Sequence, residues 1–390
     1  MNILNEAKKI EQEVIEWRRH LHENPEVGFD LDNTIDFVCK KLDEMGISYD
    51  RNIAKSAVIA EIKGKSGGKT IALRADMDAL PVKEETGLEF ASKNNCMHAC
   101  GHDAHTAMLL GACKLINGFK DELKGNVKFI FQPAEELGVG SVDVVEKGVL
   151  DDVDEILAVH VGNLTTEGKK SGELFFSEGS MMACMDKFQI TVKGKGAHGA
   201  YPAESIDPIV IASNIVMALQ EIVSREILPT RPAVVSVCQF HAGTAFNVIP
   251  GEVKLEGTVR AVTNEDRDII AKRIGEIAEG IAKSYRGEVV YDFFWQPPPL
   301  VNDPEVARKI KKTAEKLFPE DVRDLKDPVM PGEDFAWYLE KVPGSFVFLF
   351  NPMEIDGQKW AHHNSRFAID EAQFIKGYSL FAQYVYDELS

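Results

Sequence analysis

The chain has 390 residues, of which 44% are hydrophobic, and a formal net charge of −18 at pH 7. This length exceeds the size at which one hydrophobic core usually keeps growing, so two domains are expected. The negative charge argues against nucleic-acid binding, which needs a basic surface, and no run approaches the roughly 18 apolar residues of a membrane span. A charged N-terminus and six scattered cysteines favour a soluble cytoplasmic protein with free thiols.

The first part of the chain alternates helical and strand-like segments. Amphipathic periodicity predicts helices over residues 5–22 and 33–45. Apolar runs predict strands, and these are "AVIAEIKG", "KTIALRAD", "NVKFIFQ" and "EILAVH". Buried strands that alternate with helices predict a mostly parallel or mixed sheet covered on both faces, hence an α/β fold.

The glycine-rich segment "GKSGGKT", residues 64–70, superficially matches two motifs. A phosphate loop would need glycine where Lys63 stands, and a nucleophile elbow would need a helix after it. Because the segment lies between two predicted strands, a hairpin turn is the favoured interpretation.

A different pattern begins near residue 184. Strand and helix signals follow in the order β-α-β-β-α-β, which is typical of a ferredoxin-like α+β domain. The pattern ends after Trp295 at "QPPPL", whose prolines cannot continue a strand or a helix. We therefore expect residues 184–295 to be inserted into a larger domain formed by residues 1–183 and 296–390.

Side chains suited to metal binding and proton transfer follow the predicted strands. In open α/β sheets, ligands bind beyond the carboxyl ends of the strands. Residues at this edge are Asp76, Asp78, Glu135, Glu136 and His160, to which "CGHD" adds Cys100 and His102. Taken singly, each has an ordinary structural explanation, and Cys96 with Cys100 could also belong to a structural zinc site, although no second Cys/His pair follows. Taken together, they favour a catalytic metal centre.

These motifs resemble those of the M20 peptidase family. The matching segments, in chain order, are "RADMDALP", "MHACGHDAH", "FQPAEE", "LAVHV", "GKGAHGAYPAESIDP", "GTAFNVIPGEVKLEGTVR", "MPGEDFAWYL" and "HHNSRF". The sequence is most similar to the aminoacylase-like branch, which includes hippurate hydrolases, N-acyl-L-amino acid amidohydrolases, auxin-conjugate hydrolases and N-acetyl-diaminopimelate deacetylases. The resemblance implies a dinuclear metal hydrolase domain with an inserted lid and dimerisation domain.

The resemblance also implies roles for individual residues. Cys100 would bridge two metal ions, and His102, Glu136 and His160 would each bind one. The last ligand would be His362 or His363; His363 is preferred because it directly precedes the N/S-P-x-F-like segment.

The acid–base residues follow from the same resemblance. Glu135 would be the general base. Asp78 matches the aspartate of the family's H-x-D motif and would orient a ligand histidine, while Asp76 stands at that motif's histidine position. Which of Asp76 and Asp78 takes part in catalysis stays open.

Elementary chemistry agrees with this assignment. Amide hydrolysis at neutral pH needs an activated water, a polarised carbonyl and a proton for the leaving amine, and two divalent ions with one base can supply them. A thiolate ligand favours zinc, whereas histidine and carboxylate also suit manganese, cobalt or nickel.

In the inserted domain, the resemblance implies that His198, Asn247 and Arg260 contact the substrate, with His198 often reaching the partner subunit of a dimer. Two positions depart from the pattern: Ala203 replaces a common histidine, and Ser365 replaces a common proline. Of the remaining histidines, His98 and His105 are expected to form hydrogen bonds near the site, and His20 and His22 to end a helix, while His241 suits sheet packing.

The sequence therefore predicts a metal-dependent amidohydrolase that cleaves hippurate-like N-acyl-L-amino acids to a carboxylate and a free amino acid. Alternatives are N-acetyl-diaminopimelate deacetylase and dipeptidase. From a different class, the chain could be a catalytically silent protein that binds amino-acid conjugates. The expected partners are a small-molecule substrate and a second copy of the chain, without nucleic acid or membrane.

Overall fold

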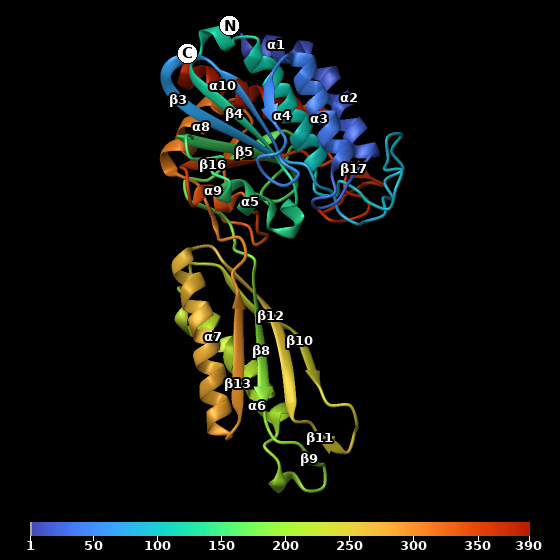
Figure 1. Ribbon diagram of the computed structural model, residues 1–390, viewed down its shortest axis with the longest axis vertical. Coiled ribbons are helices and arrows are strands. Elements are labelled where there is room, and N and C mark those ends of the chain that lie inside the picture. The colour runs from blue at the N-terminus through green and yellow to red at the C-terminus, as the bar shows by residue number, and fades with distance from the viewer. Residues whose placement is uncertain (1) are drawn as a thin grey trace. The chain divides into compact units, whose positions relative to one another are not determined.

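The computed structural model describes residues 2–390 (Figure 1). Its contacts divide the chain into two compact units. Unit 1 comprises residues 1–179, 302–327 and 334–390, and unit 2 comprises residues 180–301 and 328–333. Unit 2 contains all of segment 184–295.

Unit 1 is built on an eight-stranded mixed sheet with the strand order β1-β2-β4-β3-β5-β16-β6-β15. The bounds are β1 Ser48–Asp50, β2 Val58–Lys63, β3 Lys65–Asp76, β4 Lys124–Gln132, β5 Glu155–Gly162, β6 Glu173–Phe176, β15 Val322–Asp324 and β16 Gly344–Phe350. The central strands β4, β3, β5 and β16 run parallel, while β2 pairs antiparallel with β4. The predicted mixed α/β sheet is confirmed.

Helices cover this sheet. The longer ones are α2 Glu11–Glu23, α3 Asp32–Met45, α4 His102–Asn117, α8 Pro304–Leu317 and α10 Phe374–Leu389. The shorter ones are α1 Ile3–Lys9, α5 Gly140–Glu146 and α9 Ala336–Leu339, of which α5 and α9 pack against each other. Helix α4 packs against α2, α10 and β3, so nearly all of its residues are buried. The single helix predicted over residues 5–22 is instead two helices that meet at Ile10.

The hairpin predicted at residues 64–70 is wrong. Strands β2 and β3 are not neighbours, because β4 lies between them and pairs with both. The chain crosses the end of β4 at Gly64, whose N–H donates to the carbonyl of Gly125 over 2.9 Å. A Cβ at Gly64 would lie 2.5 Å from that carbonyl oxygen, so the close crossing requires glycine.

The sheet has a topological switch point at β3. From β3 the chain passes to β4 on one side, and then to β5 on the other. Pairing between β3 and β5 ends at Arg74 and Ala158, although β5 continues beside β16 as far as Gly162. The carboxyl ends of β3 and β5 therefore separate, which is where ligands bind in open α/β sheets.

Unit 2 has the predicted β-α-β-β-α-β order and the antiparallel strand order β10-β12-β8-β13. Its main elements are β8 Asp186–Lys193, α6 Pro208–Glu221, β10 Ala233–Ala242, β12 Glu252–Ala261, α7 Asn264–Ser284 and β13 Glu288–Phe294. Smaller pairs join β9 Ala197–His198 to β11 Val248–Ile249 and β7 Ser180–Met182 to β14 Leu300–Val301. This confirms the ferredoxin-like expectation.

Helix α6 continues as a π-helical turn, Ile222–Glu226. The combined segment, residues 208–226, is long and apolar enough to cross a membrane by length and composition alone, which is weak evidence. One of its faces packs in the core of unit 2, where Ile211, Ile215 and Leu219 are buried.

A buried ion pair holds one end of this small sheet. The carboxylate of Asp186, on β8, accepts hydrogen bonds of 2.7 and 2.6 Å from the guanidinium of Arg267, on α7. The same carboxylate accepts the backbone N–H of Gln296 over 2.8 Å. The pair therefore links β8, α7 and the segment that follows β13.

We expect Asp186→Ala to destabilise unit 2 by about 3–5 kcal/mol, because Arg267 would stay buried without its counter-charge. Chemical denaturation gives the free energy of unfolding, and hydrogen exchange should show the lost protection within residues 180–301. Asp292→Ala, at an exposed position of β13, is the matched control. Equal stability of the two variants would contradict the expectation.

Candidate active site

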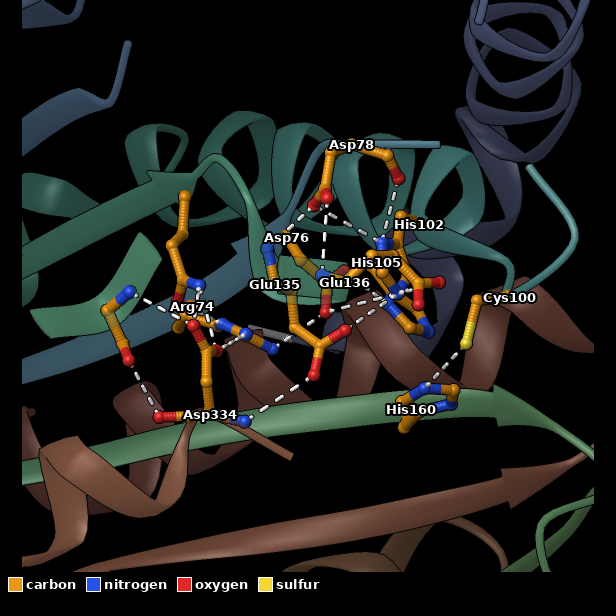
Figure 2. A network of polar contacts seen from close by, with 12 residues as sticks. Arg74, Asp76, Asp78, Cys100, His102, His105, Glu135, Glu136, His160 and Asp334 are labelled. Atoms are coloured by element: carbon orange, nitrogen blue, oxygen red, sulfur yellow. Dashed lines mark hydrogen bonds and ion pairs between the residues drawn. The ribbon is translucent and has the colours of Figure 1, made fainter. Parts of the chain in front are cut away.

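The predicted metal ligands of unit 1 come together beyond the carboxyl ends of its central strands. Figure 2 shows four of them, Cys100, His102, Glu136 and His160. Cys100 precedes α4, and His102 is the first residue of that helix. Glu136 lies in the short 3-10 helix Glu135–Leu137 after β4, and His160 lies near the end of β5. His363 comes from the segment before α10.

Unusual backbone conformations place three of these segments. Gly101 has φ +91°, and a Cβ there would lie 2.4 Å from Val161 Cγ2, so only glycine fits between the two ligands of "CGH". Ala134 and His363 adopt φ 54° and 64°, a region that side chains other than glycine rarely enter. Strain of this kind tends to concentrate at functional sites, where the surrounding structure enforces it.

The donor atoms are spaced as ligands of a metal ion are. Cys100 Sγ lies 3.6 Å from His160 Nε2, and His363 Nε2 lies 3.3 Å from Glu136 Oε2. Donors bound tetrahedrally at about 2.0–2.3 Å stand roughly 3.3–3.8 Å apart.

Cys100 belongs to two groups of ligand atoms. In each of the sets Cys100–His102–His160 and Cys100–Glu136–His363, the atoms lie within 4.8 Å of one another. His102 Nε2 and Glu136 Oε1 are buried without a hydrogen-bond partner. The residues therefore fit a pair of divalent ions that share the cysteine.

Backbone carbonyls fix the tautomers of two ligand histidines. His102 Nδ1 contacts the carbonyl oxygen of Asp78 over 2.8 Å, and His160 Nδ1 contacts that of Val161 over 2.8 Å. Because a carbonyl only accepts, each Nδ1 must carry the proton. The Nε2 lone pairs of His102 and His160 are thus left free to bind a metal.

Burial alters the pKa values of the ligands. It raises the pKa of the Cys100 thiol well above its usual value, helped by Glu136, and raises that of Glu136 to about 7. Burial lowers the pKa of His160 well below its usual range. Burial also opposes protonation of His102, but the negative charges of Asp76 and Cys100 outweigh it and raise the pKa of His102. A divalent cation would favour the thiolate and the carboxylate and replace the proton on His102.

Asp78 supports the loop that carries Glu135 and Glu136 instead of entering the cluster. Its Oδ1 accepts the backbone N–H of Glu135 over 2.9 Å, and its Oδ2 accepts that of Glu136 over 3.2 Å. The carboxylate of Glu135 has one oxygen 3.8 Å from His102 Nε2 and the other 3.4 Å from the backbone N–H of Asp334. The side chain of Glu135 therefore points at the predicted ligand cluster, while Asp78 fixes the backbone of Glu135.

Asp76 is the last residue of β3, two positions before Asp78. Its carboxylate is completely buried, accepting Arg74 Nη1 over 2.7 Å and contacting His105 Nδ1 over 2.5 Å (Figure 2). Burial alone would raise the pKa of Asp76, but His102, His105 and Arg74 lower it well below its usual value. The short contact with His105 is a hydrogen bond, because two donors of one metal ion stand farther apart.

Comparison with known proteins identifies the family. The model of peptidase family M20/M25/M40 matches residues 72–387. The chain belongs to this family. It is 41% identical over 368 residues to an N-acetyl-L-cysteine deacetylase of Bacillus subtilis, which covers 94% of this chain and 86% of the relative. It is also 42% identical over 296 residues to an N-acyl-L-amino acid amidohydrolase of Geobacillus stearothermophilus, covering 75% and 79% of the two chains.

A solved structure agrees with this placement. A protein of Bacillus subtilis, described as a dinuclear metal-binding peptidase of the M20 family, superimposes with a TM-score of 0.85 at 37% identity. The match covers 97% of this chain and 98% of the other. The resemblance to the aminoacylase-like branch is thereby confirmed, as is the M20 fold.

The substrate-contact residues expected in unit 2 do not form one cluster within it. His198 pairs with Val248 across β9 and β11, and the Asn247 carbonyl accepts the N–H of Gly199 over 2.8 Å. Arg260 lies at the other end of β12, roughly 26 Å along the strand from Glu252 at about 3.3 Å per residue. Arg260 is half-buried there and donates to the Thr258 hydroxyl and the Val259 carbonyl.

Sequence reasoning missed a second buried cluster, which braces the first turn of α4. Asp103, next to His102, accepts Arg18 Nε and His22 Nδ1, each over 2.7 Å. His22 Nε2 reaches Glu84 over 3.2 Å. The sequence predicted only that His20 and His22 end a helix, since the spacing of α2 cannot show that Arg18 and His22, four residues apart, face a buried aspartate.

This cluster predicts a pH window for stability. Burial and Arg18 lower the pKa of His22, but Asp103 and Glu84 outweigh them and raise it. Because the folded pKa lies above the unfolded value, His22 stabilises the fold below about pH 6.5, and this contribution is lost as the pH rises through the folded pKa. Burial opposes ionisation of Asp103, yet Arg18 and His22 lower its pKa strongly. Its contribution is therefore present above about pH 4 and lost as the pH falls further.

We expect His22→Gln to be less stable than the natural protein near pH 5.5 and to approach it at alkaline pH. Urea midpoints measured from pH 5 to pH 9 would show this as a flatter profile. His20→Gln, on the same helix but outside the cluster, is the control: burial lowers the pKa of His20, so this substitution should change the profile in the opposite direction, raising stability at acidic pH relative to alkaline pH. Parallel profiles for His22→Gln and the natural protein would refute the assignment.

Proposed function

We propose that the chain is a dinuclear metal-dependent amidohydrolase that cleaves N-acyl-L-amino acids to a carboxylate and a free amino acid. The observation that supports this most strongly is that Cys100 is shared by two sets of ligand atoms, with Glu135 beside them. Relatives at about 40% identity carry the names N-acetyl-L-cysteine deacetylase and N-acyl-L-amino acid amidohydrolase. Both names describe hydrolysis of the same type of amide bond.

In this proposal, Cys100, His102, Glu136, His160 and His363 hold the metal ions. When bound, two divalent ions polarise the substrate carbonyl and lower the pKa of the attacking water. Glu135 takes the proton of the water and passes it to the leaving nitrogen. Asp78 keeps Glu135 in place by accepting the backbone N–H of Glu135 over 2.9 Å.

The thiolate favours zinc, and the mixed set of sulfur, nitrogen and oxygen donors also accepts manganese, cobalt or nickel. We also propose a cytoplasmic location, which the six free cysteines support.

Turnover tests the proposal directly. Metal-reconstituted protein should hydrolyse members of a panel of N-acetyl, N-benzoyl and longer N-acyl amino acids, with N-acetyl-diaminopimelate and dipeptides included to distinguish the alternatives. Glu135→Gln should lower kcat by about 10²–10⁴-fold because the water loses its base, while isothermal titration should still detect substrate binding. Glu146→Gln, at an exposed position of α5, is the control. A protein that binds these compounds but turns none over would be a silent binder.

We also propose that unit 2 forms a homodimer. Strand β10 is an edge of its sheet, with backbone groups open to a further strand. Helix α6 exposes apolar side chains beyond its buried face; they are Ile209, Val210 and Met217, the last 73% exposed. Together, an open edge and an adjacent apolar face are typical of an interface.

The separation of His198 from Arg260 also favours a dimer. These two groups lie at opposite ends of the β12 region, so one N-acyl amino acid is too small to touch both of them in a single copy of unit 2. In a dimer, a substrate could meet Arg260 of one subunit and His198 of the other. A guanidinium can clamp a carboxylate with two hydrogen bonds.

Met217→Glu should weaken this dimer, because the interface would have to bury a carboxylate. Analytical ultracentrifugation should find the natural protein at twice the chain mass of 43.3 kDa and the variant at the chain mass. Val290→Glu introduces the same charge at an exposed position of β13, the opposite edge of the sheet, and should leave the dimer intact. A natural protein that sediments as a monomer would exclude the dimer.

A further inference from the structure

Three imidazoles contact the backbone N–H and carbonyl of one residue of β5, Val161. The backbone N–H of Val161 donates to His105 Nε2 over 2.9 Å. The carbonyl oxygen of Val161 accepts His160 Nδ1 over 2.8 Å and His362 Nε2 over 3.1 Å. Of these three histidines, only His160 is among the proposed metal ligands.

The tautomer of His105 follows from its two contacts. Nε2 faces a backbone N–H, which only donates, so this nitrogen carries no proton. Nδ1 must then carry it, and it lies 2.5 Å from Asp76 Oδ1. Burial lowers the pKa of His105, which agrees with a neutral ring.

The end of the β3–β5 pairing explains why the N–H of Val161 needs a side chain as its hydrogen-bond acceptor. Val161 lies beyond Ala158, where β3 stops pairing with β5, so its N–H has no strand partner on that side. The position is deeply buried, and an unpaired N–H there would cost about 1–3 kcal/mol. His105, from α4, takes the place of the missing strand.

We propose that His105 is a positioning residue for His160. Nε2 of His105 accepts the N–H of Val161. The carbonyl of Val161 fixes the proton of His160 on Nδ1, so that Nε2 of His160 would face a bound metal. This inference rests on the proposed function in so far as His160 is a metal ligand. Asp76 and Arg74 complete the chain of contacts behind His105.

These contacts form a continuous chain of hydrogen bonds from Asp334 to Val161. The guanidinium of Arg74 bridges the carboxylates of Asp76 and Asp334, over 2.7 and 2.9 Å. The carboxylate of Asp76 accepts the Nδ1 proton of His105. Nε2 of His105 is therefore unprotonated and accepts the backbone N–H of Val161. Each hydrogen bond polarises the next in a buried setting, so loss of the His105 contact should also loosen His160.

Asp76 thereby acquires a role that its sequence motif does not reveal. Its shortest contact is with His105 over 2.5 Å, and its other oxygen lies 3.7 Å from Nε2 of His102. Besides this direct neighbour, Asp76 orients a histidine that is not among the proposed ligands, and through it acts on the backbone of β5 beside His160.

Two substitutions separate positioning from simple space filling. His105→Leu removes both hydrogen bonds but fills the cavity with apolar atoms. His105→Gln can restore them, because its amide oxygen can accept from Val161 while its amide N–H donates to Asp76. A positioning role predicts that glutamine rescues what leucine loses.

The test measures metal binding without turnover. Metal-free full-length protein is titrated with Zn²⁺ against a competing chelator, and with Co²⁺ while the visible absorption of the thiolate–metal centre is recorded. His105→Leu should weaken binding of at least one ion by about 10–100-fold, the usual effect of removing a hydrogen-bond partner that orients a ligand histidine. It should also alter the Co²⁺ spectrum, and His105→Gln should recover most of both.

Labelling the histidines with ¹⁵N adds a direct readout. In natural protein loaded with ¹¹³Cd²⁺, the scalar coupling between cadmium and ¹⁵N should appear at Nε2 of His160. In His105→Leu, this coupling should be lost or divided between the two ring nitrogens. His20→Leu, on the surface of α2, should change neither property. If His105→Leu folds but keeps natural affinity, spectrum and coupling, the inference is overturned.

Failure of the inference is distinguishable from failure of the proposed function. If His160→Ala itself leaves metal affinity unchanged, the ligand assignment fails, and with it the proposed function. If His160→Ala abolishes binding but His105→Leu does not alter it, only the positioning role fails. Should His105→Leu not fold, His105→Met, which also removes both hydrogen bonds, carries the test; natural metal affinity and a natural Co²⁺ spectrum in this variant would contradict the proposal.

Discussion

The separation of β3 from β5 at their carboxyl ends is the constraint on which the site depends. A sheet buried on both faces must satisfy its backbone groups, and β5 loses one neighbour beyond Ala158 while it remains buried. Histidine can solve this problem, because one ring can accept from an N–H and also donate to a carboxylate. The opening that makes room for a metal centre is thus the same opening that requires His105.

The buried charged groups around this opening form one connected network of ion pairs and hydrogen bonds. Arg74 joins Asp76 to Asp334, and Asp334 also accepts the side-chain amide of Gln132 and the backbone N–H of Ser141. Removing one member of such a network leaves another charge buried and uncompensated, which costs more than the pair contributes. The network therefore stabilises mainly by restricting the strands β3 and β4 and helix α5 to one arrangement around Glu135.

Much of this could be predicted from the sequence. The alternation of apolar runs and helices gave the mixed sheet, and the β-α-β-β-α-β order gave the small domain, because both depend on local periodicity. The residues that follow β3, β4 and β5 could be grouped for the same reason, since parallel strands end at one edge.

What could not be predicted depends on contacts between distant segments. Adjacent strands in sequence suggested a hairpin at residues 64–70, but β4, from 60 residues later, inserts between them. The roles of His105, Arg18 and Asp334 depend on partners between about 29 and 260 residues away. That Nε2 of His160 is the ring nitrogen without a proton follows only from the direction of one carbonyl.

The segment that carries His363 shows how a departure from the family pattern is accommodated. Where similar sequences commonly have proline, Ser365 donates its hydroxyl to Glu85 over 2.7 Å, and its carbonyl accepts the backbone N–H of Glu85 over 2.8 Å. Proline restricts a chain through its ring, whereas Ser365 restricts it through this pair of hydrogen bonds. The N–H of His363 donates to the carbonyl of Ala99 over 2.8 Å, next to Cys100. The left-handed backbone at His363 is therefore held on both sides, and His363 is joined to the residue that precedes Cys100.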